Sequence, residues 1–263
     1  MTGAPHSSVK RYRELARTPT KHERQRELLL DGAHLLVEAR ASGLVVESAA
    51  FEQRALEDAL LRRLAEQLAA ESTDVFIVSR KVMASMSPVK TPSGVVAIAR
   101  RPVTSLDTVL AAPQSLVVVA HDIQDPGNVG GIMRTAEASG ATAFVATAAT
   151  ADPFGWKALR GSMGSALRLP IARAGLDDTL RALRTAGITT TALVPRDGLT
   201  LFGTDFREPV ALFLGGEGPG LPDEVSNKMD RLISIPMHAP VESLNVGVAA
   251  ALVLYEAFRQ RQV

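Results

Sequence analysis

Five apolar segments in the second half of the chain constrain its fold more than any other feature. They are SLVVVA (115–120), TAFVAT (142–147), ITTTALV (188–194), VALFLGG (210–216) and RLISIPM (231–237). Helical patterns lie between them, best marked over 129–139, over 176–186 and from about residue 243 onward. Near-continuous apolar strands that alternate with helices are typical of a parallel sheet covered on both faces. We therefore predict an α/β domain in this half.

The first half has the pattern of a smaller α+β domain. Helical spacing of leucines marks 20–41 and 56–68, and strand-like runs lie at 44–48, 74–79 and 94–99. Between the halves, RPVTSLDTVLAAPQS (101–115) carries two prolines and several small polar residues, as a domain boundary does. The predicted domains are 1–105 and 106–263.

Composition excludes several kinds of site. The 263 residues include no cysteine, so disulfides and thiolate sites are absent, and a reducing cytoplasm fits. No uncharged apolar run is long enough for a membrane span, and the first residues lack the apolar core of a secretory signal. The five histidines show no metal-ligand spacing, so we expect no metal.

Charge is unevenly spread along the chain. Residues 1–105 hold 16 Lys and Arg against 12 Asp and Glu, whereas residues 106–263 hold 13 against 16. A basic front half on a mildly acidic body is consistent with binding to a polyanion. A solvated helix surface explains the same charges, and on charge alone it is the favoured interpretation.

Three polar turns follow strands of the predicted sheet. HDIQDPGNVGG follows 115–120, GGEGPGLPDE follows 210–216, and IPMHAPVESLNVG follows 231–237. Ligands of parallel sheets bind beyond the carboxyl ends of the strands, so the three turns predict a site. The turns contain no phosphate-loop, dinucleotide or serine-hydrolase motif. Helix capping is the alternative, with Ser243 as the predicted N-cap of the last helix, but it leaves Asn245 unexplained.

The same turns carry a family pattern. DPGNVGGIMRTAEASG, LFLGGEGPGL and ISIPM…VESLNVGVAAALVLYE resemble, in order, the three motifs of SpoU/TrmH-type RNA ribose 2′-O-methyltransferases of the SPOUT superfamily, and they cover much of 116–258. KALRGSMGSALRLP (157–170) resembles the segment between the first two motifs. In the first half, ELLLDGAHLLVEA and VSRKVMASMSPVKTPSGVVAIA more loosely resemble the ribosomal-protein-like substrate-binding domain of many such enzymes, although Asp31 stands where the family often has Glu.

The resemblance implies a fold and a function. The fold would be a C-terminal parallel-sheet methyltransferase domain with a trefoil knot formed near 210–250, preceded by a smaller α+β RNA-binding domain. The cofactor would be S-adenosylmethionine, and a homodimer through the knotted domain would complete the active site. The reaction would be methyl transfer to a ribose 2′-hydroxyl of large-subunit (23S) ribosomal RNA, either housekeeping or conferring antibiotic resistance. Transfer RNA as substrate, or a catalytically silent RNA-binding or ribosome-assembly factor, are the alternatives.

The motifs also assign residues. The catalytic set implied by the resemblance is Asn128, Arg134, Glu217, Ser243 and Asn245. Arg134 would lie at the 2′-hydroxyl, either as general base or, as we prefer, as an orienting group, because guanidinium holds its proton far above neutral pH. Asn128 would hold the ribose or Arg134, and Glu217 would hold Arg134 or a substrate hydroxyl. Intact motifs argue against the silent factor.

Two further sets complete the predicted contacts. The cofactor would be bound by Val194, Leu214, Gly215, Gly216, Ile235, Pro236, Met237, Ser243, Leu244 and Asn245. RNA phosphates would be bound by the basic residues of the first half: Arg11, Arg13, Arg17, Lys21, Arg24, Arg26, Lys81 and Lys90.

Overall fold

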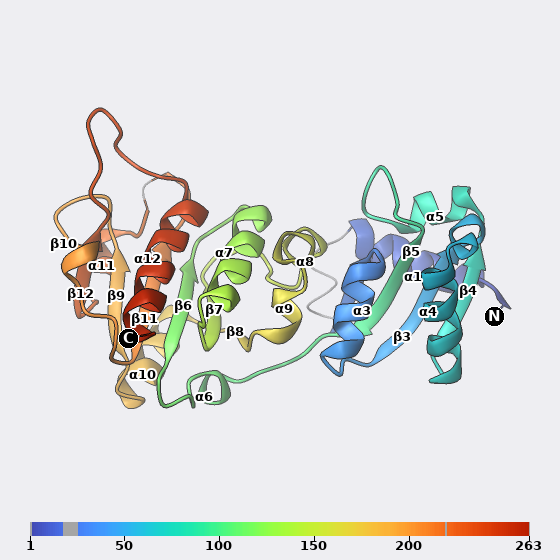
Figure 1. The fold of residues 1–263 in the computed structure, drawn as a ribbon, viewed down its shortest axis with the longest axis horizontal. Helices are drawn as coiled ribbons and strands as arrows, with labels where there is room; N and C mark the ends of the chain where they lie inside the picture. Colours follow the sequence, from blue (N-terminus) through green and yellow to red (C-terminus); the bar gives the residue numbers. More distant parts are fainter. Residues whose placement is uncertain (1, 18–25, 219, 263) are drawn as a thin grey trace. The chain divides into compact units, whose positions relative to one another are not determined.

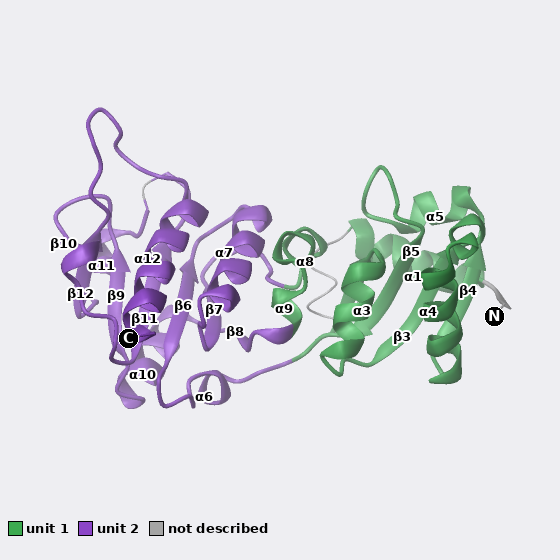
Figure 2. Cartoon of the chain, in the orientation of Figure 1, with its two compact units in different colours: residues 1–102, 154–167 green, residues 103–153, 168–263 purple. Residues whose placement is uncertain are grey.

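The computed structural model describes residues 2–17, 26–218 and 220–262, and it divides into two units. Unit 1 comprises 1–102 and 154–167, and unit 2 comprises 103–153 and 168–263 (Figure 2). The division lies close to the predicted boundary between 105 and 106. Residues 154–167, which lie inside the predicted second domain, cluster with unit 1.

Unit 1 is a mixed five-stranded sheet with the order β1-β4-β3-β5-β2. Its strands are β1 (Thr2–Gly3), β2 (Glu27–Asp31), β3 (Val46–Glu52), β4 (Asp74–Val78) and β5 (Val95–Arg100). Its helices are α1 (His6–Arg17), α3 (Ala33–Ala41), α4 (Ala59–Ala70) and α5 (Arg80–Met86), with the 3-10 turn η1 (Gln53–Glu57) and α8 (Trp156–Ser162). Side chains of α1 and α5 share one core with the sheet, and α3 and α4 lie on the opposite face (Figure 1).

The predicted helix over 20–41 is wrong in its middle. Residues 20–25 lie outside the described part, Glu27–Asp31 form β2, and only Ala33–Ala41 are helical. Leu28, Leu29 and Leu30 are all fully buried, because β2 pairs with β5 and both faces of the sheet are covered. Three consecutive buried leucines suit such a strand, whereas a helix would bury only one face.

Unit 2 is a seven-stranded parallel sheet with the order β10-β12-β9-β11-β6-β7-β8. Its strands are β6 (Leu116–His121), β7 (Ala143–Thr147), β8 (Ile171–Arg173), β9 (Thr189–Leu193), β10 (Leu199–Thr200), β11 (Val210–Gly215) and β12 (Arg231–Ser234). Its helices are α6 (Leu106–Val109), α7 (Pro126–Ala138), α10 (Leu176–Thr185), α11 (Asp223–Ser226) and α12 (Val246–Arg261), with the 3-10 turn η2 (Leu201–Gly203). The short α9 (Ser165–Arg168) belongs to unit 1 except for Arg168. The predicted parallel α/β sheet is confirmed.

The sheet of unit 2 positions the polar turns. The central strands β11 and β6 are completely buried, as their apolar sequences require. Because the strands are parallel, the turns after β6, β11 and β12 all lie at one edge of the sheet. Helices α7 and α12, which follow the first and third turns, pack against each other (Figure 1). Among the described residues, no helix has the length and apolar character that crossing a membrane requires.

Candidate active site

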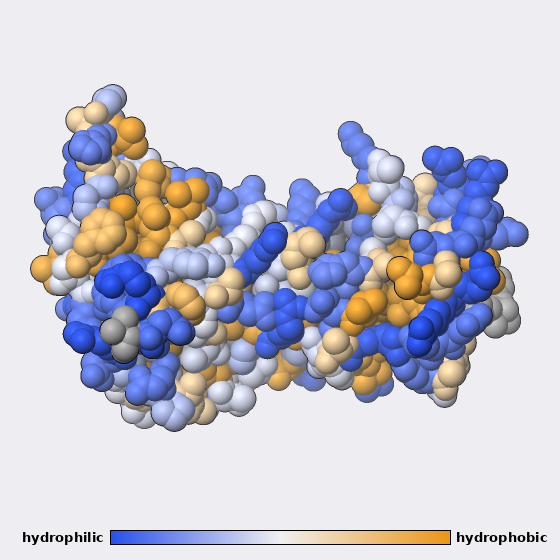
Figure 3. All heavy atoms as spheres, in the orientation of Figure 1, coloured by the Kyte–Doolittle hydropathy of each residue, from blue (hydrophilic) through white to orange (hydrophobic). Residues whose placement is uncertain are grey.

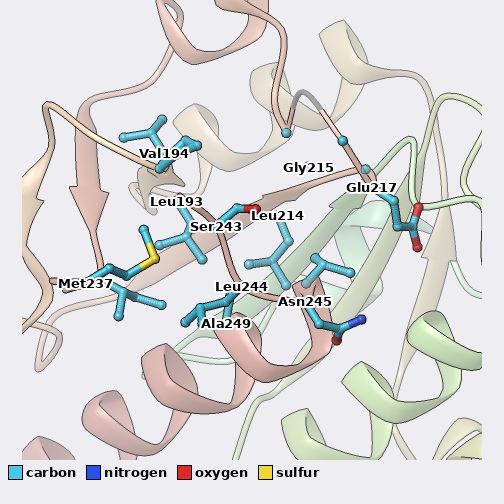
Figure 4. A pocket seen from close by; sticks show the side chains of 16 residues that line it. Leu193, Val194, Leu214, Gly215, Glu217, Met237, Ser243, Leu244, Asn245 and Ala249 are labelled. Atoms are coloured by element: carbon cyan, nitrogen blue, oxygen red, sulfur yellow. The ribbon is translucent and has the colours of Figure 1, made fainter. Parts of the chain in front are cut away.

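A cavity of about 380 Å³ lies at the edge of the sheet where the polar turns meet. Its walls come from the end of β9, the turn after β11, the segment after β12 and the start of α12. Aliphatic side chains form the middle of the cavity, including Leu193, Leu214, Leu244 and Ala249 (Figure 4). Met237 lies at one end, and Glu217 with Asn245 at the other. The cavity is therefore mostly apolar with a polar rim, as small-molecule sites usually are.

Three polar side chains from three segments form one hydrogen-bonded chain at that rim. Asn128 Nδ2 donates to Glu217 Oε1 at 2.6 Å, and Asn245 Nδ2 donates to Asn128 Oδ1 at 3.2 Å. Glu217 Oε2 also accepts from the backbone N–H of Gln124 at 3.2 Å. The turns after β6 and β11 and the start of α12 are thus held together by side chains that the sequence separates by up to 117 positions.

Asn245, and not Ser243, is the N-cap of α12. Its Oδ1 accepts from the backbone N–H groups of Gly247 at 2.9 Å and Val248 at 3.3 Å. The predicted Ser243 cap is therefore wrong, because the helix begins at Val246, three residues later than Ser243. Asn245 looked misplaced in the sequence only because the helix was expected to start earlier. The oxygen of its amide caps the helix, and the nitrogen donates to Asn128 at the rim of the cavity.

Two glycines of the turn after β11 are required by close backbone approach. A Cβ at Gly215 would lie 2.2 Å from the backbone of Gly220 and Leu221, and one at Gly216 would lie 2.2 Å from the carbonyl oxygen of Asp122. A side chain at Gly215 would distort the turn itself, and one at Gly216 would push the turn away from the exit of β6. The glycines thus bring Glu217 within reach of Asn128.

Hydrogen bonding keeps Glu217 ionised. Partial burial raises the pKa of its carboxyl, but the bonds from Asn128 and from nearby backbone N–H groups outweigh burial and leave the pKa below its usual value. A carboxylate with a lowered pKa is a weak general base. The geometry therefore favours a positioning role for Glu217.

Comparisons with known proteins identify the family of the chain. Residues 115–255 match the SpoU rRNA Methylase family, and residues 6–97 match the MRM3-like substrate binding domain. The chain is 36% identical to an uncharacterized tRNA/rRNA methyltransferase of Synechocystis, over 99% of this chain and 94% of that protein. It is 30% identical to the 23S rRNA (guanosine(2553)-2′-O)-methyltransferase RlmP of Bacillus subtilis, over 96% of each chain.

The fold has close solved counterparts as well. The AdoMet-bound rRNA methyltransferase from Sinorhizobium meliloti superposes with a TM-score of 0.88 at 28% identity, covering 98% of this chain and 97% of that one. The chain belongs to the SpoU rRNA methylase family. It is an RNA methyltransferase of the SPOUT fold with an N-terminal substrate-binding domain. The trefoil knot expected near 210–250 stays a prediction.

The structure of this SpoU methylase gathers most of the predicted cofactor residues. The cavity is lined by Val194, Leu214, Gly215, Gly216, Ile235, Met237, Ser243, Leu244 and Asn245, whereas Pro236 lines a neighbouring cavity. Sequence reasoning missed Leu193, Pro195, Gly218, Gly220, Val246 and Ala249. The position of Leu193 at the end of a predicted strand, and of Ala249 one helical turn after Asn245, were the available signals.

Arg134 of the SpoU methylase lies apart from the predicted set. It is exposed on α7, and in the described part of the chain no hydrogen bond or ion pair reaches its guanidinium. Glu217 binds Asn128 and the backbone N–H of Gln124. Its expected role in holding Arg134 or a substrate hydroxyl stays a prediction. Ser243 lines the cavity, and no described residue bonds its hydroxyl.

The basic residues predicted to bind RNA divide into two groups. Arg11 is held between Glu27 at 2.6 Å and Glu47 at 2.5 Å, and Arg13 donates to Ser85 Oγ at 2.8 and 3.0 Å. The exposed group comprises Arg17, Arg26, Lys81 and Lys90. Lys21 and Arg24 lie outside the described residues. Over those residues, no group of three or more His, Asp or Glu side chains is placed to hold a metal ion.

Proposed function

We propose that this protein transfers the methyl group of S-adenosylmethionine to a ribose 2′-hydroxyl of large-subunit ribosomal RNA in the cytoplasm. The observation that carries the proposal is the apolar cavity with the Glu217–Asn128–Asn245 chain at its rim. Similarity over nearly the whole chain to a 23S rRNA 2′-O-methyltransferase supports the RNA class. Transfer RNA is the alternative substrate.

The residues present fit this cofactor. Leu193, Leu214 and Leu244 offer aliphatic surface to a purine, and bare backbone at Gly215–Gly218 offers N–H and C=O groups to its polar edge. Ser243 can bond a ribose or carboxylate oxygen. When bound, the cofactor supplies an electrophilic methyl group on a sulfonium. The protein's own contribution is then to align a ribose oxygen with that methyl group.

The rim residues would supply this alignment. Asn128 is fixed by Glu217 on one side and Asn245 on the other, so its position relative to the cavity is set by three segments at once. We propose that this chain of bonds positions the target ribose. Arg134 would orient the hydroxyl or an adjacent phosphate as the oxygen attacks, and stabilise its developing negative charge.

We further propose a homodimer in which Arg134 reaches the partner's site. Helix α12 carries three large exposed apolar side chains one turn apart, Val248 (51% exposed), Leu252 (44%) and Tyr255 (51%). Hydrophobic atoms gather over α12 on the face shown in Figure 3. An apolar stripe of this kind marks an interaction surface. The partner that we propose is a second copy of this chain. Arg134 on the adjacent α7 does not line the cavity of its own chain, so it would act on a ribose bound at the cavity of the partner.

The test is a methyl-transfer assay. Purified protein is incubated with methyl-labelled S-adenosylmethionine and, separately, unmodified large-subunit ribosomal RNA and bulk transfer RNA, with Arg134→Ala beside each. We expect label on ribosomal RNA, recovered as a 2′-O-methylated nucleoside and lost in Arg134→Ala. Label on transfer RNA alone would favour the alternative substrate. Absence of both label and cofactor binding would favour the silent RNA-binding factor.

A further inference from the structure

A second cavity shares a wall with the cofactor cavity. It has a volume of about 500 Å³ and is lined by Asp122, Gln124, Asp125, Pro126, Gly216, Glu217 and Gly220. Gly216, Glu217 and Gly220 also line the first cavity, so the turn after β11 separates the two. A volume of this order is enough for a nucleoside-sized group. The second cavity therefore lies directly beyond the rim at which the ribose is proposed to react.

The charges of this second cavity exclude a phosphate as its occupant. Asp122, Asp125 and Glu217 all line it, and no lysine or arginine does. Like charges at close range repel strongly when partly shielded from water. The cavity suits a neutral group rich in N–H donors.

Most of the polar groups in the second cavity are already bonded. Asp125 Oδ1 accepts from the N–H groups of Gly127 at 2.5 Å and Asn128 at 3.0 Å, so its carboxylate caps α7. Glu217 uses both oxygens on Asn128 and Gln124. Asp122, Gln124 and Oδ2 of Asp125 keep bonding capacity, and Gln124 alone among them is a donor.

The side chains of Asp122 and Gln124 form one pattern. Gln124 Nε2 donates one hydrogen to Asp122 Oδ1 at 3.2 Å, which leaves its second N–H free. Beside it the Asp122 carboxylate has unused acceptor capacity. A base edge lying along the Gln124 N–H and the two Asp122 oxygens would meet a donor followed by two acceptors. The Watson–Crick edge of guanine presents the complement: O6 accepts, N1–H donates and N2–H donates. Adenine, cytosine and uracil each place at least one like group against this pattern.

We propose that the second cavity is the pocket for the target base and that Asp122 and Gln124 select guanosine. Asp122 would accept from N1–H and N2–H, and Gln124 would donate to O6. Pro126 would offer apolar surface to the face of the ring. This assignment rests on the proposed function and narrows it to one nucleoside.

The backbone at Asp122 makes a clean variant available. Asp122 has φ +57°, a left-handed conformation that asparagine adopts as readily as aspartate. Asp122→Asn therefore keeps the turn and the side-chain size while replacing one acceptor oxygen by a donor. Asp223→Asn is the matched control, because Asp223 is exposed on α11 and lines neither cavity.

The first arm identifies the product. In-vitro-transcribed large-subunit ribosomal RNA is methylated by the full chain and digested to nucleosides, and we expect 2′-O-methylguanosine. A 2′-O-methyl derivative of adenosine, cytidine or uridine would overturn the inference and leave the proposed function standing. Absence of methylation on any RNA would overturn both.

The second experiment removes the proposed hydrogen bond between Asp122 and N2–H in two ways, once from the RNA and once from the protein. Once the modified position is mapped, a transcript carrying inosine there lacks the N2 amino group. We expect inosine to lower kcat/KM of the wild type about 10-fold, and Asp122→Asn to lower it roughly 10- to 100-fold on guanosine. In Asp122→Asn the penalty for inosine should nearly vanish, since its partner is already gone. Asp223→Asn should behave as wild type.

Cofactor affinity serves as the internal check. Calorimetric binding of S-adenosylmethionine should be the same in Asp122→Asn and wild type. Equal loss of cofactor binding and turnover would place Asp122 in the cofactor site and overturn the assignment. An unchanged rate with an unchanged inosine penalty would do the same.

Discussion

At the scale of single residues, Glu217 is held as an acceptor by two donors. Glu217→Gln turns one of its oxygens into a donor, so either Asn128 or the Gln124 N–H loses its partner. We expect methyl transfer to fall about 100-fold, as misplacement of a positioned group does, while the melting temperature changes little because the side chain is exposed. Radiolabel incorporation and thermal unfolding measure the two effects. A rate within twofold of wild type would refute the positioning role.

Asp31 gives a prediction about acid stability. Its side chain is 6% exposed, and burial raises the pKa above its ordinary value of 3.8, although the Ser87 hydroxyl and Arg160 act in the opposite direction. A raised pKa means that the folded state binds the proton more tightly than the unfolded state. The contribution of Asp31 to stability is therefore most favourable at low pH and declines as the pH rises through the range just above 3.8.

Asp31→Asn should remove the part of the pH dependence of the free energy of unfolding that comes from Asp31. Urea unfolding at a series of pH values, followed by fluorescence, measures it, because Trp156 is the single tryptophan and belongs to unit 1. Asp230→Asn is the control of opposite sign, and because Asp230 lies in unit 2 its unfolding is followed by far-UV circular dichroism. Hydrogen bonds from the backbone N–H and hydroxyl of Thr190 lower the pKa of Asp230, so its stabilisation is present above the ordinary value and lost as the pH falls. Parallel slopes in the two variants would contradict the analysis.

At the scale of elements, Asn245 serves α12 and the site with different atoms. Asn245→Asp keeps the oxygen that caps the helix but loses the N–H to Asn128. Asn245→Ala loses both. We expect Asn245→Ala to lower the free energy of unfolding by about 1 kcal/mol, and Asn245→Asp to leave it nearly unchanged while turnover falls in both.

Ser243→Ala tests whether Ser243 caps α12 or contributes to the cofactor cavity. Because Ser243 lines the cavity and α12 begins after it, this change should weaken S-adenosylmethionine binding without lowering the melting temperature. Calorimetry and thermal unfolding measure the two. A drop in melting temperature equal to that of Asn245→Ala would restore Ser243 as a cap.

At the scale of the whole molecule, the exposed stripe of α12 predicts self-association. Leu252→Glu places a charge in its middle, and burying that charge in a dimer costs several kcal/mol. We expect the variant to sediment as a monomer and to lose activity in proportion to the loss of dimer. Leu60→Glu is the matched control, because Leu60 is 78% exposed on α4 of unit 1. A wild type that is already monomeric and active would contradict the proposed dimer.

The charge distribution predicts which basic residues bind RNA. Lys90→Ala should weaken RNA binding and reduce the salt dependence of the affinity by about one phosphate contact, since Lys90 is exposed. Arg11→Ala should instead lower stability, because it leaves Glu27 and Glu47 without their shared partner. Filter binding over a range of salt concentrations, beside thermal unfolding, distinguishes them.

The amino-acid pattern was enough to predict the parallel sheet of unit 2 and the edge at which its site lies. Continuous apolar strands have one stable arrangement, and polar turns at their carboxyl ends must then meet at one edge. It also carried motifs specific enough to indicate the family and the residues around the cavity. Those signals are local in the chain, which is why reading along it recovered them.

The pairing of strands and the hydrogen-bond partners of the site residues followed only from the tertiary structure. Pairing with β5 made a strand of Glu27–Asp31, although its leucines also suit a helical stripe. Hydrogen bonds across more than eighty positions pair Glu217 with Asn128 and not with Arg134. Asn245 is both the N-cap of α12 and part of the polar rim of the cavity. The cavity lined by Asp122 and Gln124 lies where Gly216 lets two turns that are distant in the sequence approach closely. Hydrogen-bond partners depend on distances in space, and spacing along the chain does not encode them.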